Sequence, residues 1–588
     1  MKDLVSHQLV RFLEDRGVEH LFGLCGHSNI AVLTAMANNS IKFVNTRHEQ
    51  IAAHIADGYA RARGAKTSVM LSHCGPGLTN AATGVATAQS DSIPMVVIAG
   101  DIPSHMYGRH PHQEINLHAD AQQYEIYRPF VKRAWRVDRA DKFPEILEKA
   151  FQLAEAGRPG PVLVSVPMDV FSAEIEVGLW DRAKKHTRKL EKPSIDEVTA
   201  ERIVKILGEA SKPVLYVGGG VMLAQAYGEL AEFADFMTIP VAHSLMGKGV
   251  VADDHPMVLG MTGFWGTKYT NESTRTADYI LALGTRFCEA DSSSFEDEYT
   301  FDIPNRTKLI HIDIDDNEIG RNYPAEIGAI ADLKQALTVL LRVARRLYPD
   351  GRKNAALRAE IAKHHADFKA SRAENEASTQ YPMRPERILA DLRAVMPRDF
   401  IMTTDVGWNK NGVGQQFDIL TPGSILTPGG FATMGFGSPA AIGAKIACPD
   451  RVVVSLVGDG GFGQNPAALA TAVEENVAVI WVIMNNGAYG TIAGLQKAHY
   501  GTTVGTVFTK RTGEPYSPDY AAMARSYGVE GERIESADQF KPALERAMAS
   551  GRPYVLDVIM ENAPVPTSGH WNIMDIYSPG KKVHHVAT

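Results

Sequence analysis

VVVSLVGDGGFGQNPAALATAVEENVAVIWVIMNN, which runs from Val452 to Asn486, is the stretch that decides the fold. It begins with an apolar, β-branched run that suits a strand buried on both faces of a parallel sheet. Gly458-Asp459-Gly460-Gly461 follows, and its glycines allow a sharp turn and a close approach to a ligand. A helical segment, roughly 465 to 475, then leads to a second apolar run ending in Asn485-Asn486. We expect both polar ends at one edge of adjacent parallel strands, where open α/β sheets bind ligands.

These polar residues predict a site for a hard cation. The Asp459 carboxylate, a second oxygen-donating side chain and nearby carbonyls would leave open positions for phosphate oxygens. A glycine-rich turn in an ordinary βαβ unit is the alternative for an isolated GDG. Here, however, GDG is followed after 27 residues by the second Asn of an Asn-Asn pair. This spacing resembles the signature of thiamine diphosphate (ThDP) enzymes, which implies that the magnesium ligands are Asp459, Asn486 and the Ala488 carbonyl, and that the diphosphate lies against Gly458, Gly460 and Gly461.

Composition excludes several classes of protein. The chain has 588 residues, 45% hydrophobic and 22% charged, which is ordinary for a soluble protein of several domains. A net charge of −8 argues against a nucleic-acid surface. No apolar run approaches the roughly 20 residues that span a bilayer, and MKDLVSHQLVRF lacks the apolar core of a signal peptide. The four cysteines are widely scattered without CxxC spacing, so we expect reduced thiols and a cytoplasmic protein.

Strand-like and helix-like runs alternate along the chain, which predicts three doubly wound parallel-sheet α/β domains. We expect a first domain at 1–185, a middle domain at 195–347 after the polar linker HTRKLEKPS, and a third at 380–562 after a charged, alanine-rich helix. The tail, 563–588, lacks a clear period but contains a Trp and a Tyr, which suggests a lid. The order matches acetolactate synthase-like ThDP enzymes, which have a pyrimidine-binding, a middle and a diphosphate-binding domain.

The ThDP interpretation requires a buried carboxylate against the aminopyrimidine ring of the cofactor, because that contact helps to generate the reactive carbanion. NTRHEQIAAHIADGYARARG puts Glu49 just after a strand, at the start of a helix. A glutamate in a first helical turn often only complements the helix dipole. The pattern RHEQxAxxxADGYAR nevertheless resembles the segment that carries the catalytic Glu of acetolactate synthases, which implies that role for Glu49.

Three further segments resemble the same family in the expected order. CGPGLTNAATGVATA contains the turn with Gly75 and Pro76. TTDVGWNKN parallels the loop that binds the diphosphate, which implicates Gly407, Trp408 and Asn409. GGFATMGFGSPAAIGAK parallels the segment whose Met supports the bent cofactor, and that residue is Met434. A Met in an apolar segment is more often core filler, so this assignment depends on the resemblance.

The middle domain carries segments that look like the FAD-contacting stretches of acetolactate synthase. They include VGGG, GTRF and HIDID, which implicate Gly218, Gly219, Gly220, Arg286 and Asp313. A glycine-rich turn after a strand could equally be a remnant that binds nothing. We expect bound FAD in a structural role. A nicotinamide dehydrogenase is disfavoured, because no GxGxxG follows the strand.

The sequence departs from acetolactate synthase where substrate would bind. Cys288-Glu289-Ala290 replaces the Asp-Asp-Arg whose Arg holds the second 2-oxo acid, and Leu495 stands where the synthases have a selective Trp. A carboxylate without its bidentate Arg loses most of its recognition. His27, His73 and His112-Gln113 occupy positions at the reactive end of the cofactor, and Gln113 is retained. Three histidines at one site favour proton transfer or polar-substrate binding over three structural roles.

These observations predict a ThDP- and magnesium-dependent lyase or carboligase for a 2-oxo acid or a 1,2-dicarbonyl compound, acting through an enamine, and not a true acetolactate synthase. Glu49 would activate the cofactor, while His27, His73 and Gln113 would handle substrate oxygens and protons. The alternatives are an FAD-linked oxidase of the pyruvate oxidase type, a cyclic 1,2-diketone hydrolase like cyclohexane-1,2-dione hydrolase, and a non-catalytic binding protein. The family pairs its first and third domains across a subunit interface, which implies a homodimer or homotetramer without nucleic-acid or membrane partners.

Overall fold

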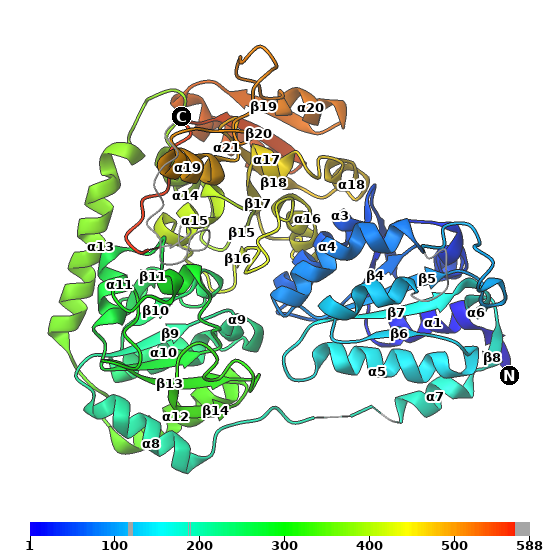
Figure 1. The fold of residues 1–588 in the computed structure, drawn as a ribbon, viewed down its shortest axis with the longest axis horizontal. Coiled ribbons are helices and arrows are strands. Elements are labelled where there is room, and N and C mark those ends of the chain that lie inside the picture. The colour runs from blue at the N-terminus through cyan, green and yellow to red at the C-terminus, as the bar shows by residue number, and fades with distance from the viewer. Residues whose placement is uncertain (116–121, 186, 189, 571–588) are drawn as a thin grey trace.

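The computed structural model describes residues 1–115, 122–185, 187–188 and 190–570, and it contains three six-stranded parallel sheets, each flanked by helices (Figure 1). This confirms the predicted fold class. The sequence 571–588, which includes most of the expected lid, lies outside the described residues. No helix in the described part of the chain is long and apolar enough to cross a membrane.

The first sheet has the strand order β3-β2-β4-β5-β7-β6. Its central strands are buried along their whole length, as the apolar runs predict. The strands, in spatial order, are Lys42–Asn45, His20–Gly23, Ser68–Ser72, Met95–Asp101, Pro161–Pro167 and Ala134–Arg136. The main helices are α1 Val5–Asp15, α2 Ile30–Ala35, α3 Glu49–Ala62, α4 Pro76–Ser90 and α5 Phe143–Glu155. A small antiparallel pair, β1 Lys2–Leu4 and β8 Glu174–Glu176, and the helices α6 Met168–Phe171 and α7 Gly178–Lys184 complete this part.

The third sheet repeats the topology of the first. Its order is β16-β15-β17-β18-β20-β19, so both sheets follow the order 2-1-3-4-6-5 when strands are counted along the chain. The strands are Ile425–Leu426, Ile401–Thr404, Val453–Gly458, Val479–Asn485, Tyr554–Ile559 and Glu530–Ile534. The helices are α14 Pro385–Val395, α15 Trp408–Gln416, α16 Gly437–Ala447, α17 Asp459–Phe462, α18 Ala468–Glu474, α19 Gly490–Tyr500, α20 Tyr520–Ser526 and α21 Ala537–Ser550.

The middle sheet has a different order, β11-β10-β9-β12-β13-β14, which is 3-2-1-4-5-6 along the chain. Dinucleotide-binding folds have this order, and they bind their ligand where the strand order reverses. The strands are Val258–Met261, Val241–His243, Pro213–Val217, Tyr279–Leu283, Lys308–Asp313 and Ala325–Ile330. The helices are α8 Glu197–Glu209, α9 Gly220–Ala224, α10 Tyr227–Met237, α11 Lys268–Arg275 and α12 Leu333–Leu347, and the long α13, Ala355–Glu376, leads to the third domain.

The stretch from Val452 to Asn486 contains two adjacent parallel strands, β17 and β18, as predicted, with Gly458 opposite Met484. The helix between them begins later than expected. The GDG turn winds directly into the one-turn helix α17, and α18 starts only at Ala468. A tertiary contact explains the break, because Asn465 Nδ2 donates to the Gly435 carbonyl at 2.9 Å and holds this segment in a turn.

Helices α3 and α16 join the first and third domains (Figure 1). Glycines bring the two backbones into direct contact. A Cβ on Gly58 would lie 2.2 Å from the carbonyl oxygen of Ala440, and a Cβ on Gly443 would lie 2.0 Å from the carbonyl oxygen of Ile55. Beside this contact the buried Arg61 pairs with Asp57 and Asp91, and it donates to the Thr427 carbonyl at 3.0 Å. A buried cation that satisfies groups of both domains fixes their relative orientation.

Gly58→Ala tests the importance of this helix contact. The new methyl group would clash with backbone that cannot rotate away, so we expect a loss of about 1–3 kcal/mol of stability. Thermal unfolding measures it as a lower midpoint. Gly228→Ala on α10 is the matched control, since nothing lies within 4 Å of a Cβ there. An equal midpoint for both variants would contradict the close-contact argument.

Candidate active site

The polar residues singled out in the sequence gather at two equivalent points of the first and third sheets. In each sheet the strand order reverses between the first and third strands, β2 and β4 or β15 and β17. The loops that follow these two neighbouring strands leave in opposite directions, and this opens a crevice at the carboxyl edge of the sheet. His27 and His73 follow β2 and β4, while Gly407 and Asp459 follow β15 and β17.

Glu49 is the first residue of α3, as predicted, and only 4% of its surface is exposed. His48 caps the helix, because its Nδ1 accepts the backbone N–H of Gln50 at 3.1 Å. Asn80 Nδ2 donates to Glu49 Oε2 at 2.9 Å. A Cβ on Gly77 would lie 3.4 Å from Glu49 Oε1 and 3.1 Å from His73 Cβ. The buried carboxylate therefore lies across the glycine turn from the histidines.

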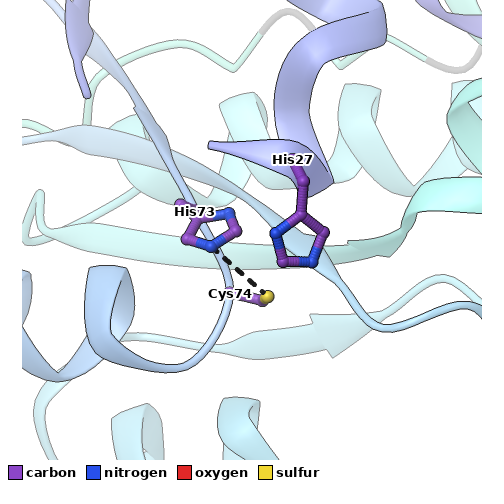
Figure 2. Close-up of side chains that lie close together, drawn as sticks. All are labelled: His27, His73 and Cys74. Atoms are coloured by element: carbon purple, nitrogen blue, oxygen red, sulfur yellow. Dashed lines mark hydrogen bonds between the residues drawn. The ribbon is translucent and has the colours of Figure 1, made fainter. Parts of the chain in front are cut away.

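The three histidines are neighbours, as the sequence predicts. The ring centroids of His27 and His73 are 4.6 Å apart, and those of His27 and His112 are 5.6 Å apart. Figure 2 shows His27 and His73 approaching each other from two elements, with Cys74 beside them. Burial, together with the two neighbouring imidazoles, lowers the pKa of His27. Burial raises the pKa of the Cys74 thiol.

Hydrogen bonds fix the orientation of His73. Its Nε2 is 2.6 Å from Gln113 Oε1, and its Nδ1 is 2.8 Å from Ser28 Oγ. Ser28 Oγ also accepts the Cys74 N–H at 3.0 Å. His73 can donate through Nε2 to Gln113 while the Ser28 hydroxyl donates to Nδ1.

The Gly75-Pro76 turn begins α4 and requires glycine. Gly75 has φ +59, and a Cβ there would lie 2.3 Å from the carbonyl oxygen of Gln113, so the two loops are in contact. Gln123 Oε1 accepts the Gly75 N–H at 3.0 Å, while its Nε2 donates to the Gly100 carbonyl at 2.9 Å. The loop that carries Gln113 therefore lies against the glycine turn that packs beside Glu49.

In the third domain, buried Asp405 connects two of the predicted cofactor segments. Its carboxylate accepts the N–H of Gly435 at 3.2 Å and of Gly437 at 2.9 Å, which fixes the backbone next to half-buried Met434. Burial raises the pKa of Asp405. Asn409 Oδ1 accepts the Asp405 N–H at 2.9 Å, and its Nδ2 donates to the Val406 carbonyl. Gly407, with φ +105, and Trp408 lie inside this closed loop.

The predicted metal ligands lie at the ends of neighbouring strands. Asp459 follows β17, is 1% exposed, and accepts the Gly487 N–H at 3.0 Å through Oδ2. Asn486 follows β18, and its Oδ1 accepts the Ala488 N–H at 3.2 Å. Burial raises the pKa of Asp459 to about 6. A Cβ on Gly461 would lie 2.5 Å from Asp405 Oδ1, so the GDG turn packs directly on the Asp405 loop. Gly460 packs against the ring of Tyr489.

Glu49, His27 and His73 form one group of predicted site residues, which we call the Glu49 group, and Asp459 and Asn486 form another, the Asp459 group. Among the described residues, no hydrogen bond or ion pair joins the two groups within one chain. The first and third domains are in contact elsewhere. These contacts include Arg61, Thr87, whose hydroxyl is 3.1 Å from that of Thr433, and Thr471, which donates to the Asn45 carbonyl. Residues of the two groups are therefore positioned by different parts of the chain.

A cavity of about 1060 Å³ opens at the reversal point of the middle sheet. Gly218, Gly219 and Gly220 line it after β9, Arg286 after β12, and Asp313 at the end of β13. The first domain contributes Arg158 to its wall. Burial raises the pKa of Asp313 to about 6. All five predicted middle-domain residues therefore face one cavity.

Positions 288–290 and 495, where the sequence departs from the family pattern, lie in two different environments. Cys288 donates its thiol hydrogen to Asp291 Oδ2 at 2.8 Å, and the Ala290 carbonyl accepts the Phe264 N–H. Leu495 is half-buried in α19. Next to this region, Lys410 is buried, its Nζ donates to the Gly429 carbonyl, and burial lowers its pKa. The side chain of residue 290 therefore offers substrate no charge.

Sequence reasoning missed four residues that hold the site together, namely Ser28, Asn80, Gln123 and Asp405. Asn80 and Asp405 stand inside motifs that were recognised, GPGLTN and TTDVG, so the signal was present. Ser28 and Gln123 act through contacts 46 and 48 residues away in sequence. Only the packed sheet shows those contacts.

Comparisons with known proteins agree with this geometry. Residues 4–122, 200–340 and 405–558 match, respectively, the N-terminal TPP-binding, central and C-terminal TPP-binding domains of thiamine pyrophosphate enzymes. The probable acetolactate synthase large subunit of Methanocaldococcus jannaschii is 36% identical over 95% of this chain and 92% of its own. An acetolactate synthase of Arthrospira platensis is 34% identical over 96% of both chains. A chloroplastic acetolactate synthase of Arabidopsis thaliana is 33% identical over 97% of this chain and 84% of its own.

The chain therefore belongs to the thiamine diphosphate-dependent enzymes of the acetolactate synthase-like family. This confirms the predicted family, and with it an enzyme that transfers or joins carbon units.

Proposed function

We propose that this protein is a ThDP- and magnesium-dependent lyase or carboligase for a 2-oxo acid or a 1,2-dicarbonyl compound, and that acetolactate synthesis is not its main reaction. The observation that carries the proposal is the polar cluster of His27, His73 and Gln113 next to the Glu49 turn. Such a cluster suits the adjacent oxygens of a dicarbonyl substrate, which accept hydrogen bonds.

The residues of this chain fit the cofactor. Buried Glu49 has one oxygen held by Asn80, so its other oxygen can contact an aminopyrimidine. The buried Trp408 indole N–H has no acceptor among the described residues, and a diphosphate oxygen would provide one. Gly458 lies beside Asn409, since a Cβ there would be 3.4 Å from Asn409 Nδ2. The proposed diphosphate site also takes Gly407, Gly460 and Gly461, while Met434 would support the bent cofactor. ThDP, when bound, supplies the carbon nucleophile and accepts the electron pair of the broken C–C bond.

The proposed Mg²⁺ ligands are Asp459, Asn486 and the Ala488 carbonyl. The buried Asp459 carboxylate accepts hydrogen bonds from neutral backbone groups such as the Gly487 N–H, so a bound cation would compensate its charge. Carboxylate, amide and carbonyl oxygens are ligands that Mg²⁺ prefers.

Residues 290 and 495 are the reason why we propose a different main reaction from that of the relatives named acetolactate synthase. Ala290 carries no charge, and its carbonyl already accepts a hydrogen bond from the Phe264 N–H. Without a guanidinium the carboxylate of a second 2-oxo acid loses its bidentate partner. The histidine cluster favours a second candidate reaction, hydrolytic cleavage of a cyclic 1,2-diketone, since that reaction needs polar groups around two neighbouring carbonyls.

A product screen tests the proposed reaction. Purified protein with ThDP and Mg²⁺ is offered pyruvate, glyoxylate, benzoylformate, sulfoacetaldehyde and cyclic 1,2-diones, and mass spectrometry identifies the products. Glu49→Gln should lower turnover by roughly 100- to 10,000-fold, because it removes the proton-transferring carboxylate. The control is Glu197→Gln, which changes an exposed first-turn glutamate on α8. Acetolactate as the dominant product, or full turnover by Glu49→Gln, would refute the proposal.

We propose further that FAD occupies the middle-domain cavity. The strand order 3-2-1-4-5-6, the glycines at its reversal point and the basic side chain of Arg286 support this. FAD in a structural role is the main proposal. An oxidase of the pyruvate oxidase type is the alternative, because a bound flavin could accept electrons.

Flavin retention tests the FAD proposal. Arg286→Ala should weaken FAD binding at least about tenfold, the effect expected for one lost charged hydrogen bond. Visible flavin absorbance per chain measures it, with Arg342→Ala on the exposed face of α12 as the control. Anaerobic addition of substrate distinguishes the roles, since bleaching indicates an oxidase and an unchanged spectrum a structural flavin. A colourless wild-type protein that does not take up FAD would reject the proposal.

We also propose a cytoplasmic homodimer or homotetramer in which Glu49 of one chain completes the cofactor site of another. The separate positions of the Glu49 and Asp459 groups within one chain support this assembly. The proposed domain limits are 1–185, 195–347 and 380–562, with 563–588 as a lid. Among the described tail residues, Ser568 donates to the Gly266 carbonyl at 2.6 Å, so this segment lies on the middle domain.

Complementation tests the shared site. Glu49→Gln and Asp459→Asn chains are each inactive alone, but a mixed dimer contains one intact site if each site combines two chains. Random mixing should then restore about one quarter of wild-type turnover per site. If each chain builds its own site, refolded or co-expressed mixtures stay inactive.

A further inference from the structure

His27, His73 and Cys74 form a group that the proposed reaction does not fully use. Their ligand atoms all lie within 4.8 Å of one another, and among the described residues this is the one group of three or more His, Cys, Asp or Glu side chains close enough to share a metal ion (Figure 2). We propose that these three residues bind a zinc ion, separate from the Mg²⁺ site, and that the bound ion excludes substrate. The exclusion rests on the proposed function, whereas metal binding does not.

The distances suit a tetrahedral ion. Zinc–sulfur and zinc–nitrogen bonds of about 2.3 and 2.0 Å, at a tetrahedral angle, place the two ligand atoms about 3.5 Å apart. Cys74 Sγ and His73 Nε2 are 3.8 Å apart. Figure 2 shows the His27 ring turned toward both of them. Only small side-chain movements would therefore bring the three ligands around one ion, and a water molecule could fill the fourth position.

The surrounding residues orient the ligands. Ser28 Oγ accepts the Cys74 N–H at 3.0 Å and lies 2.8 Å from His73 Nδ1. It can also accept an Nδ1–H once the 3.4 Å hydrogen bond from the Ser28 backbone N–H to Nδ1 is given up. A metal-bound imidazole usually donates its second N–H in this way. Gly26 leaves the space for the ring, since a Cβ there would lie 2.3 Å from His73 Cγ. Asn29 Oδ1 accepts the Gly26 N–H at 3.0 Å and closes the turn that carries His27.

Metal binding and substrate binding would use the same atom of His73. Its Nε2 faces Gln113 Oε1 at 2.6 Å, and an ion on Nε2 must replace that hydrogen bond. The imidazole proton would then lie on Nδ1 and be donated to Ser28, while the Cys74 thiol releases its proton. The ion would thus remove His27, His73 and Gln113 from the carbonyl oxygens of substrate.

The two proposed metal sites differ in ligand chemistry. One thiolate and two imidazoles favour Zn²⁺ over Mg²⁺, whereas the oxygens at Asp459 and Asn486 favour Mg²⁺. Co²⁺ replaces Zn²⁺ in such sites and absorbs light through its bond to a thiolate. That absorption reports cysteine ligation and is silent for an ion bound by oxygens alone.

Cobalt titration of the holoenzyme with ThDP and Mg²⁺ tests the site. Wild-type protein should show thiolate-to-cobalt absorption that one equivalent of Zn²⁺ removes. Cys74→Ala should abolish it, while Cys25→Ala and Cys448→Ala, which change the neighbouring exposed and a distant thiol, should retain it. Ser28→Ala should weaken Zn²⁺ binding about 10- to 100-fold. No thiolate absorption in the wild type, or the same absorption in Cys74→Ala, overturns the proposed site.

Turnover tests the exclusion of substrate. Zinc should inhibit the wild type and Cys448→Ala, a chelator should reverse this, and the same zinc concentration should leave the turnover of Cys74→Ala unaffected. Cobalt absorption without inhibition overturns the exclusion but keeps the metal site. Failure of the wild type to convert any carbonyl compound argues against the proposed function, and the absorption spectrum still decides whether the metal site exists.

Discussion

The reversal of strand order in the parallel sheets is the constraint on which the rest of this structure depends. Where neighbouring strands send their loops in opposite directions, backbone groups and side chains at the carboxyl edge stay uncovered. The first and third sheets share one strand order, so the chain builds this crevice twice. One crevice holds Glu49 and the histidines near the glycine turn, and the other holds Asp459 and Asn486. A third reversal, in the middle sheet, opens the large cavity.

Close backbone contacts and one buried arginine keep the two related domains together. Gly58 and Gly443 allow α3 and α16 to touch through their backbones, and the buried Arg61 links Asp57 and Asp91 to the Thr427 carbonyl. Buried ion pairs contribute little net stability, but removing one partner is costly. Together these contacts therefore specify the orientation of the domains, while the apolar strands supply most of the burial.

The chemistry changes sharply along the proposed cofactor site. Around Asp459 and Asn486 the donors are oxygens, which suit magnesium and phosphate. Around His27, His73 and Cys74 they are nitrogen and sulfur, which suit softer ions or the hydrogen-bonding needs of a dicarbonyl compound. Ala290 and Leu495 offer neither a charge nor an aromatic ring at the two positions on which the proposed function depends. The proposed reaction type thus depends on a few side chains, while the fold follows the family.

The sequence by itself determined the three α/β domains, the parallel pairing of β17 with β18, the start of α3 at Glu49 and the grouping of three histidines. Buried parallel strands are continuous apolar runs, and glycine turns follow them at fixed positions, so local pattern predicts the domains and strands. The grouping of the histidines was implied by the resemblance to the family. Only the tertiary structure decided that Asn80 binds Glu49, that Asp405 fixes the segment beside Met434, that Asn465 delays α18, and that Ser28 joins His73 to Cys74. Each of these contacts joins residues distant in sequence, and its geometry depends on how sheets and helices pack, which no local pattern specifies.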